Sequence, residues 1–161
     1  PDGYVVCLGR DGVARRIAEQ LYFPNGLCFD PTGEWLYIAE TYKQRVWVGR
    51  WEAERGEWKS PAVFSQLWGP IGPDGMAADV RGSLYVALFD QGVVVQIAPT
   101  GKVDATHEIL GKRPTNVAFD PSGEHGLVVT EAAEGRVLSL PVEAVGAPLC
   151  IGPKPGKGAA V

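Results

Sequence analysis

Gly72-Pro73-Asp74-Gly75-Met76-Ala77-Ala78-Asp79 decides the fold expected for this chain, because the same pattern occurs three times. An earlier copy covers Phe23–Asp30, and a weaker copy covers Arg113–Asp120. The second residue of each copy is a proline, which we interpret as part of a tight turn, and each copy continues as a short apolar strand. The copies recur after about 40–50 residues, which is the period of β-propeller blades.

The sequence on either side of these copies consists of further short apolar runs separated by turns rich in glycine and proline. The expected strands are Tyr4–Leu8, Val13–Ala18, Gly26–Phe29, Trp35–Ala39, Arg45–Arg50, Gly56–Phe64, Met76–Asp79, Ser83–Leu88, Val93–Ala98, Val103–Ile109, Val117–Phe119, Gly126–Thr130, Arg136–Leu140 and Ala147–Ile151. Evenly spaced short strands of this kind are typical of an all-β protein. We therefore predict a β-propeller built from four-stranded antiparallel blades.

The repeat divides residues 1–151 into about three and a half blades. A partial blade covers 4–22, complete blades cover 23–68, 69–112 and 113–151, and 152–161 form a flexible tail rich in glycine, proline and lysine. Propellers normally close with about 4–8 blades. We therefore expect either that the sequence is a piece of a longer chain or that copies self-associate to complete the ring.

Composition limits the classes of partner. The net charge is −4 and the basic residues are scattered, whereas a nucleic-acid-binding protein presents a basic patch. A membrane partner is disfavoured for the same reason, and no apolar run reaches the roughly 20 residues of a membrane-spanning helix. The three cysteines form no Cys-X-X-Cys pair, which favours a reducing, cytoplasmic compartment. A removed targeting segment is the alternative, since the chain begins with Pro1 rather than Met.

Asn25, Asp74 and Thr115 occupy equivalent positions in the three copies. The innermost strand of every propeller blade lines the central channel, so equivalent residues at the start of these strands meet at its mouth. An amide, a carboxylate and a hydroxyl supply oxygen ligands of the kind that hard divalent cations prefer. The alternative is purely structural, because Pro-Asn-Gly and Pro-Asp-Gly are common turn sequences in which glycine permits a sharp bend.

The ordered set of Pro24-Asn25-Gly26, Pro73-Asp74-Gly75-Met76 and Pro114-Thr115-Asn116 resembles the senescence marker protein, gluconolactonase and luciferin-regenerating-enzyme family. The resemblance covers about Tyr4 to Leu140 and corresponds to the C-terminal half of a family member. It implies a six-bladed propeller with a single divalent metal ion in the channel, Ca²⁺ first and Mn²⁺, Mg²⁺ or Zn²⁺ as alternatives. It also implies a metal-dependent lactonase that opens a sugar lactone or a similar small cyclic ester.

The same resemblance assigns roles to individual positions. Asn25 and Asp74 match the metal-binding residues of the family, and Asp74 is also its general base or nucleophile. Thr41 and Thr115 match positions in the wall of the substrate pocket. The family draws a glutamate and another asparagine ligand from earlier blades, which this sequence does not include.

Other functions remain as alternatives. One alternative is a non-catalytic propeller that binds a ligand or partner. The other is an enzyme resembling strictosidine synthase or phosphotriesterase, whose strands also end as Ala39-Glu40-Thr41 does. The sequence has no Gly-X-Ser-X-Gly motif for a serine hydrolase.

We expect structural roles for the remaining polar residues. Glu40 and Glu131 are hydrogen-bonding residues at strand ends, Asp30, Asp79 and Asp120 are turn caps, and His107 and His125 are exposed or loop residues.

Overall fold

The computed structural model describes residues 1–149, which form thirteen strands and one short 3-10 helix in four antiparallel sheets. The first sheet has two strands, β1 (Gly3–Leu8) and β2 (Ala14–Leu21). The other three sheets follow in chain order. They contain β3 (Pro24–Phe29), β4 (Trp35–Glu40), β5 (Arg45–Glu52) and β6 (Glu57–Gln66); β7 (Pro73–Ala78), β8 (Leu84–Leu88), β9 (Val93–Ile97) and β10 (Val103–Glu108); and β11 (Pro114–Phe119), β12 (Leu127–Glu131) and β13 (Arg136–Leu140).

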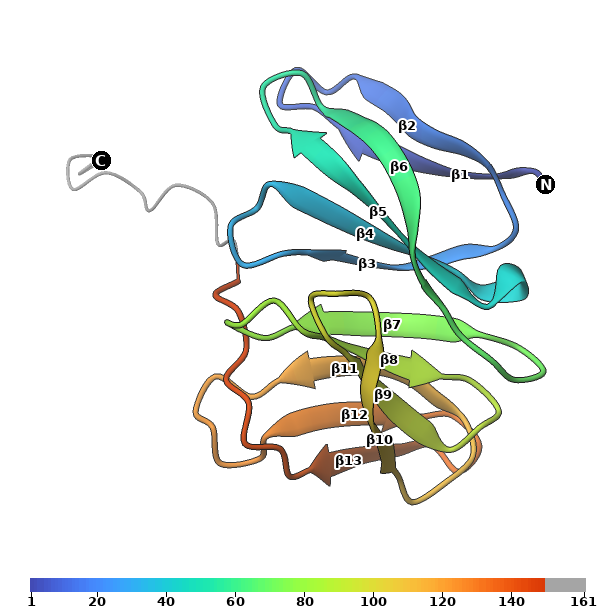
Figure 1. The fold of residues 1–161 in the computed structure, drawn as a ribbon, viewed down its shortest axis with the longest axis vertical. Helices are drawn as coiled ribbons and strands as arrows, with labels where there is room; N and C mark the ends of the chain where they lie inside the picture. The colour runs from blue at the N-terminus through green and yellow to red at the C-terminus, as the bar shows by residue number, and fades with distance from the viewer. Residues whose placement is uncertain (150–161) are drawn as a thin grey trace.

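The sheets are arranged as propeller blades. Within each sheet the strands are neighbours in chain order, and the first strands of successive sheets lie side by side, β3 against β7 and β7 against β11 (Figure 1). These strands are therefore the innermost strands of their blades, as the repeat predicts. The β7–β10 sheet is packed between two neighbouring blades.

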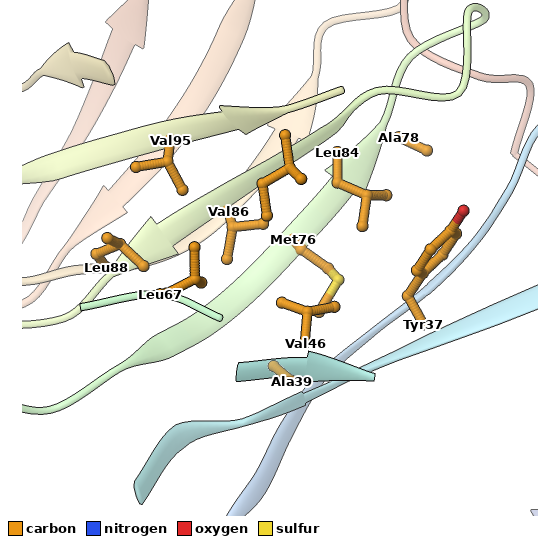
Figure 2. Close-up of a cluster of buried hydrophobic side chains, with 11 residues drawn as sticks. Tyr37, Ala39, Val46, Leu67, Met76, Ala78, Leu84, Val86, Leu88 and Val95 are labelled. Carbon is orange, nitrogen blue, oxygen red and sulfur yellow. The ribbon is translucent and has the colours of Figure 1, made fainter. Parts of the chain in front are cut away.

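The core lies between the blades because successive residues of a strand point to opposite faces. Every residue of β8 is buried. Leu84 and Val86 face the preceding blade, where they pack with Val46 and Met76 (Figure 2). Tyr85 belongs instead to the cluster shared with the following blade, together with Ala87, Val94, Val117, Leu127 and Val129. Burial of both faces explains why β8 is apolar throughout rather than alternating.

The three proline motifs are strands with a β-bulge, so the prediction of a turn at these positions is wrong. In β3, Pro24 pairs with Glu40 and Leu27 with Ile38, which leaves one extra residue on β3. In β7 the equivalent shift lies between Pro73 and Met76. In β11 it lies just after Pro114. A bulge bends the strand and redirects its side chains, and bulges are common next to functional sites.

The last blade departs from the predicted arrangement. Its sheet has three strands within residues 1–149, and Ala147–Leu149 do not form the expected fourth strand; Cys150 and Ile151 lie outside the described residues. The segment after β13 instead runs back to the preceding blade. The Val80 N–H donates to the Val145 carbonyl at 2.9 Å, and the Ala147 N–H donates to the Ala78 carbonyl at 2.9 Å.

The turn caps agree with the sequence analysis. The carboxylate of Asp30 accepts the backbone N–H groups of Thr32 and Trp35, and Asp79 and Asp120 hold the equivalent turns of the next two blades. The connection between β4 and β5 is a 3-10 turn at Thr41–Lys43. Among residues 1–149 there is no helix long and apolar enough to cross a membrane.

Candidate functional site

The innermost strands bring Asn25, Asp74 and Thr115 together, as the repeat predicts. They line one hollow of about 320 Å³ at the beginning of β3, β7 and β11. The rest of its lining comes from the residues that follow them, which are Gly26, Leu27, Gly75, Met76 and Asn116. Three segments that are far apart in the sequence thus build one polar site with an apolar wall.

Gly26 and Gly75 allow the three inner strands to approach one another closely. A Cβ at Gly26 would collide with the backbone carbonyl of Asp74, and a Cβ at Gly75 would collide with Asn116. Neither glycine is among the positive-φ residues of the described chain, so the sharp bend expected at these positions is absent. Their function is to remove side-chain bulk where blade meets blade.

Asp74 is the only charged side chain among the residues that line this hollow. Partial burial raises the pKa of its carboxyl group, and hydrogen bonds from the Asn25 side chain and the Gly75 backbone offset part of that rise. None of the ion pairs among residues 1–149 includes Asp74. Its negative charge therefore faces the hollow with an amide, but no cation, beside it.

Asn116 is a site residue that the sequence analysis did not single out. It directly follows Thr115, and its Oδ1 atom accepts a hydrogen bond from the Val117 N–H at 2.9 Å. The Thr115 hydroxyl lies 2.7 Å from the hydroxyl of Thr130 on the neighbouring strand, β12. The available signal was the Pro-Thr-Asn motif itself, in which the bulge brings both polar residues to the hollow.

Thr41 does not line the hollow. Its side chain is buried, and its hydroxyl donates a hydrogen bond of 2.7 Å to the carbonyl of Pro73. Since Pro73 immediately precedes Asp74, this bond ties the end of β4 to the beginning of the next blade's inner strand. The assignment of Thr41 to substrate binding stays a prediction.

The donor chemistry of the hollow fits a hard divalent cation. Its polar side chains carry amide, carboxylate and hydroxyl oxygens, and no histidine or cysteine lines it. Within residues 1–149 there is no group of three or more histidine, cysteine, aspartate or glutamate side chains that would hold a metal ion by themselves. A cation here would therefore bind to one carboxylate supplemented by neutral oxygens.

Glu40 and Glu131 have the structural role that the sequence analysis gives them. Glu40 is fully buried, and its carboxylate accepts bonds from the Tyr22 N–H, from Arg45 Nε at 2.6 Å and from Trp47 Nε1 at 2.7 Å. Burial raises its pKa, but these donors reverse the effect, so the pKa lies below its ordinary value. Glu131 accepts the N–H groups of Arg113, Ala133 and Glu134. Both carboxylates are thus hydrogen-bonded at strand ends, and neither lines the hollow.

Comparison with known proteins identifies the family of the chain. Residues 1–133 match the family described as SMP-30/Gluconolactonase/LRE-like region. The chain is 30% identical over 134 residues to a protein of Sulfolobus acidocaldarius, covering 82% of this chain and 49% of that relative. It is 29% identical over 125 residues to the 6-deoxy-6-sulfogluconolactonase of Pseudomonas putida, covering 76% of this chain and 43% of that relative.

The fold comparison agrees. A crystal structure of the calcium-binding protein regucalcin from Agrobacterium tumefaciens matches with a TM-score of 0.70 at 25% identity, covering 81% of this chain and 49% of that one. The chain spans about half the length of the relatives it matches. With the blade arrangement described above, these matches show that the chain belongs to the SMP-30/gluconolactonase/LRE-like family of β-propellers.

Proposed function

We propose that the chain carries part of the active site of a metal-dependent lactonase that opens a sugar lactone or a similar small cyclic ester. The observation that carries this proposal is the convergence of Asn25 and Asp74 on one hollow from separate blades. The lactonase activity is supported by the name of the sulfogluconolactonase relative. The metal is supported by the description of the regucalcin structure as a calcium-binding protein.

Asn25 and Asp74 are the residues that would hold the cation, with the side-chain oxygen of Asn116 or Thr115 nearby. When bound, a divalent cation supplies Lewis-acid polarisation of the lactone carbonyl and stabilises negative charge on its oxygen. The oxygens of this chain would hold the cation, and therefore its positive charge, at the mouth of the channel. All-oxygen donors suit Ca²⁺, Mg²⁺ and Mn²⁺, and Ca²⁺ is the first choice because the regucalcin structure is described as a calcium-binding protein.

Asp74 is the catalytic residue in this proposal. Its carboxylate has no ion-pair partner among the described residues, so it is free to take a proton from water or to attack the carbonyl directly. The Asn25 amide lines the hollow beside the carboxylate, while Leu27 and Met76 form an apolar wall. The two pathways differ in whether an acyl-enzyme forms at Asp74.

The test uses the 161-residue chain, Ca²⁺ and Mn²⁺ in calorimetric titrations, and hydrolysis of glucono-1,5-lactone followed by acid release. We expect Asp74→Asn to weaken cation binding and to lower the hydrolysis rate by about 100-fold or more. Asp104→Asn makes the same chemical change in a carboxylate on β10 that does not line this hollow, and should preserve both. Lactone hydrolysis that persists in Asp74→Asn would refute the role of Asp74, and cation binding without hydrolysis would favour a binding module.

A further inference from the structure

A second and larger hollow, of about 550 Å³, lies at the other end of the β7–β10 sheet. Asp74 stands near the start of β7, whereas the second hollow begins at Asp79, just beyond its end. A strand advances about 3.3 Å per residue, which places the two hollows roughly 15 Å apart. The volume is within the range of about 300–1,000 Å³ that is usual for small-molecule sites.

The floor of this hollow is polar and buried. Asp79, Ser83 and Tyr85 are each less than a tenth exposed, and all three line it. Asp79 is fixed by hydrogen bonds that its Oδ1 atom accepts from the N–H groups of Arg81 at 2.9 Å and Ser83 at 2.8 Å. Burial together with the charge of Asp79 raises the pKa of the Tyr85 hydroxyl, and Arg81 opposes this rise. Several polar groups therefore converge here.

His107 supplies an unsatisfied polar atom at the same place. Its imidazole ring stacks on Tyr85, with ring centroids 6.1 Å apart and an interplanar angle of 25°. Its Nε2 atom is buried and is the one buried side-chain nitrogen or oxygen in residues 1–149 without a hydrogen-bond partner. The expectation that His107 is an exposed or loop residue is thus wrong. Leaving such an atom unpaired is unfavourable, and because His107 itself lines the hollow, a small movement of its ring would bring Nε2 within reach of a bound molecule.

The rim carries charge of both signs. Arg81, Asp104 and Glu143 are exposed and line the hollow, and none of them forms an ion pair within the described chain. Gln96 lies half-buried between floor and rim. The lining thus offers hydrogen-bond donors and acceptors on several sides. A hydroxyl group suits such a lining because it both donates and accepts.

The segment Pro141–Ala144 forms one wall, and it is anchored beyond the hollow. Val145 and Ala147 are hydrogen-bonded to the end of the β7 strand, and Gly146 passes so close to Phe119 that a Cβ there would collide with its ring. Phe119 in turn packs edge-on against Tyr85, with centroids 5.1 Å apart. The elements around the hollow therefore hold one another in place.

We propose that this hollow binds a neutral polyhydroxylated small molecule of monosaccharide size, at a site separate from the Asp74 hollow. The ligand hydroxyls pair with Gln96 inside the hollow and with Arg81 at its rim, and a small movement of the His107 ring adds its Nε2 atom to the same network. The two hollows share no lining residue, so this site stands apart from the proposed lactonase activity.

The experiment exploits the fact that the chain has two histidines, His107 and His125. Long-range ¹H–¹⁵N spectra of the imidazoles are recorded while D-sorbitol or D-glucose is added to the full chain, with cyclohexanol as a single-hydroxyl control. We expect both polyols to shift the nitrogens of His107 saturably at millimolar concentration, and cyclohexanol to have no such effect. His125, which does not line the hollow, serves as the internal control and should not move.

Two variants complete the test. Arg81→Ala removes an exposed side chain, so the fold is retained, and it should weaken polyol binding by about tenfold. Asp74→Asn should leave polyol binding unchanged even if it abolishes cation binding and hydrolysis, which separates this proposal from the proposed function. Absence of a saturable His107 shift up to about 50 mM polyol, an equal shift with cyclohexanol, or unchanged binding in Arg81→Ala would each overturn it.

Discussion

At the residue scale, the candidate site depends on two residues that have no side chain. Gly26 and Gly75 lie where β3 meets β7 and where β7 meets β11, and any Cβ there would strike the neighbouring strand. The obstruction at Gly26 is backbone, which cannot turn away as a flexible side chain does. The distance between Asn25 and Asp74 is thus set by glycine as well as by the residues that carry the chemistry.

We therefore expect Gly26→Ala to destabilise the protein by about 1–3 kcal/mol, because overpacking pushes β3 away from β7. It should also weaken cation binding. Urea denaturation and calorimetry on the same variant measure the two effects. Gly33→Ala is the matched control, since a Cβ at that turn meets nothing within 4 Å and only its positive φ is unfavourable. Equal loss of cation binding in both variants would show that close packing at Gly26 does not shape the site.

At the element scale, buried carboxylates fix the ends of the second strands. Glu40 ends β4 and Glu131 ends β12, and each gathers backbone or side-chain donors from the adjoining loops. Leu88 ends the equivalent strand β8 and is fully buried in the apolar core. In the middle blade, apolar packing therefore takes the place of the polar network at the end of the second strand. This is possible because neighbouring blades cover both faces of the middle blade.

Glu40→Gln should lower the free energy of unfolding at pH 7 by about 2 kcal/mol, because hydrogen bonds to a buried carboxylate are lost or weakened. The pKa of Glu40 in the folded protein is below 4.5, so its ionised form stabilises the fold above that pH. The stability difference between wild type and variant should shrink as the pH falls below 4.5. Urea denaturation from pH 7 to pH 3 measures it, with the exposed Glu34→Gln as control. A difference that stays constant to pH 3 would contradict the ionised network.

Thr41 joins two blades through its bond to the Pro73 carbonyl. Thr41→Val keeps the shape of the side chain but removes this donor, and should reduce stability by about 1–2 kcal/mol. Thr41→Ser keeps the hydroxyl and should retain most of the bond. Urea denaturation compares the two variants, and lactone KM tests the predicted role in substrate binding. A raised KM in Thr41→Val at unchanged stability would favour substrate contact over a structural tie.

At the scale of the whole molecule, burial is unequal among the sheets. The β7–β10 sheet is covered by neighbouring blades on both faces, whereas β1 and β2 form a two-stranded sheet that packs mainly through Val5 and Leu21. Tyr4 and Leu8 of β1 are exposed. In a repeat protein, each unit is stabilised chiefly by its neighbours.

Hydrogen exchange should therefore differ along the chain. We expect amides of β8 to exchange only through global unfolding, and amides of β1 and β2 to be less protected, by on the order of 100-fold, through local opening. Exchange measured by NMR or mass spectrometry gives the protection of each strand. Because β8 pairs with both β7 and β9 whereas β1 pairs with β2 alone in the described chain, the comparison is made only between amides that are hydrogen-bonded in the sheets. Equal protection would mean that the sheets unfold as one unit.

The repeat in the sequence predicted much of this molecule. Short apolar runs between turns predicted the strands, and the equivalence of Asn25, Asp74 and Thr115 predicted their meeting, because turn residues and the blade repeat are written in local sequence. The aspartate turn caps were predictable for the same reason, since each bonds to residues within five positions along the chain. Local features of this kind need no partner strand to be recognised.

The remaining features were decided by tertiary structure alone. The proline motifs become bulges rather than turns because each pairs with a second strand, and Gly26 and Gly75 serve close packing because another blade lies against them. Asn116 joins the site through a bulge of the same kind, and His107 lines the second hollow together with a segment from beyond β13. Contacts between residues distant in sequence leave no local periodicity. They are fixed only when the blades pack.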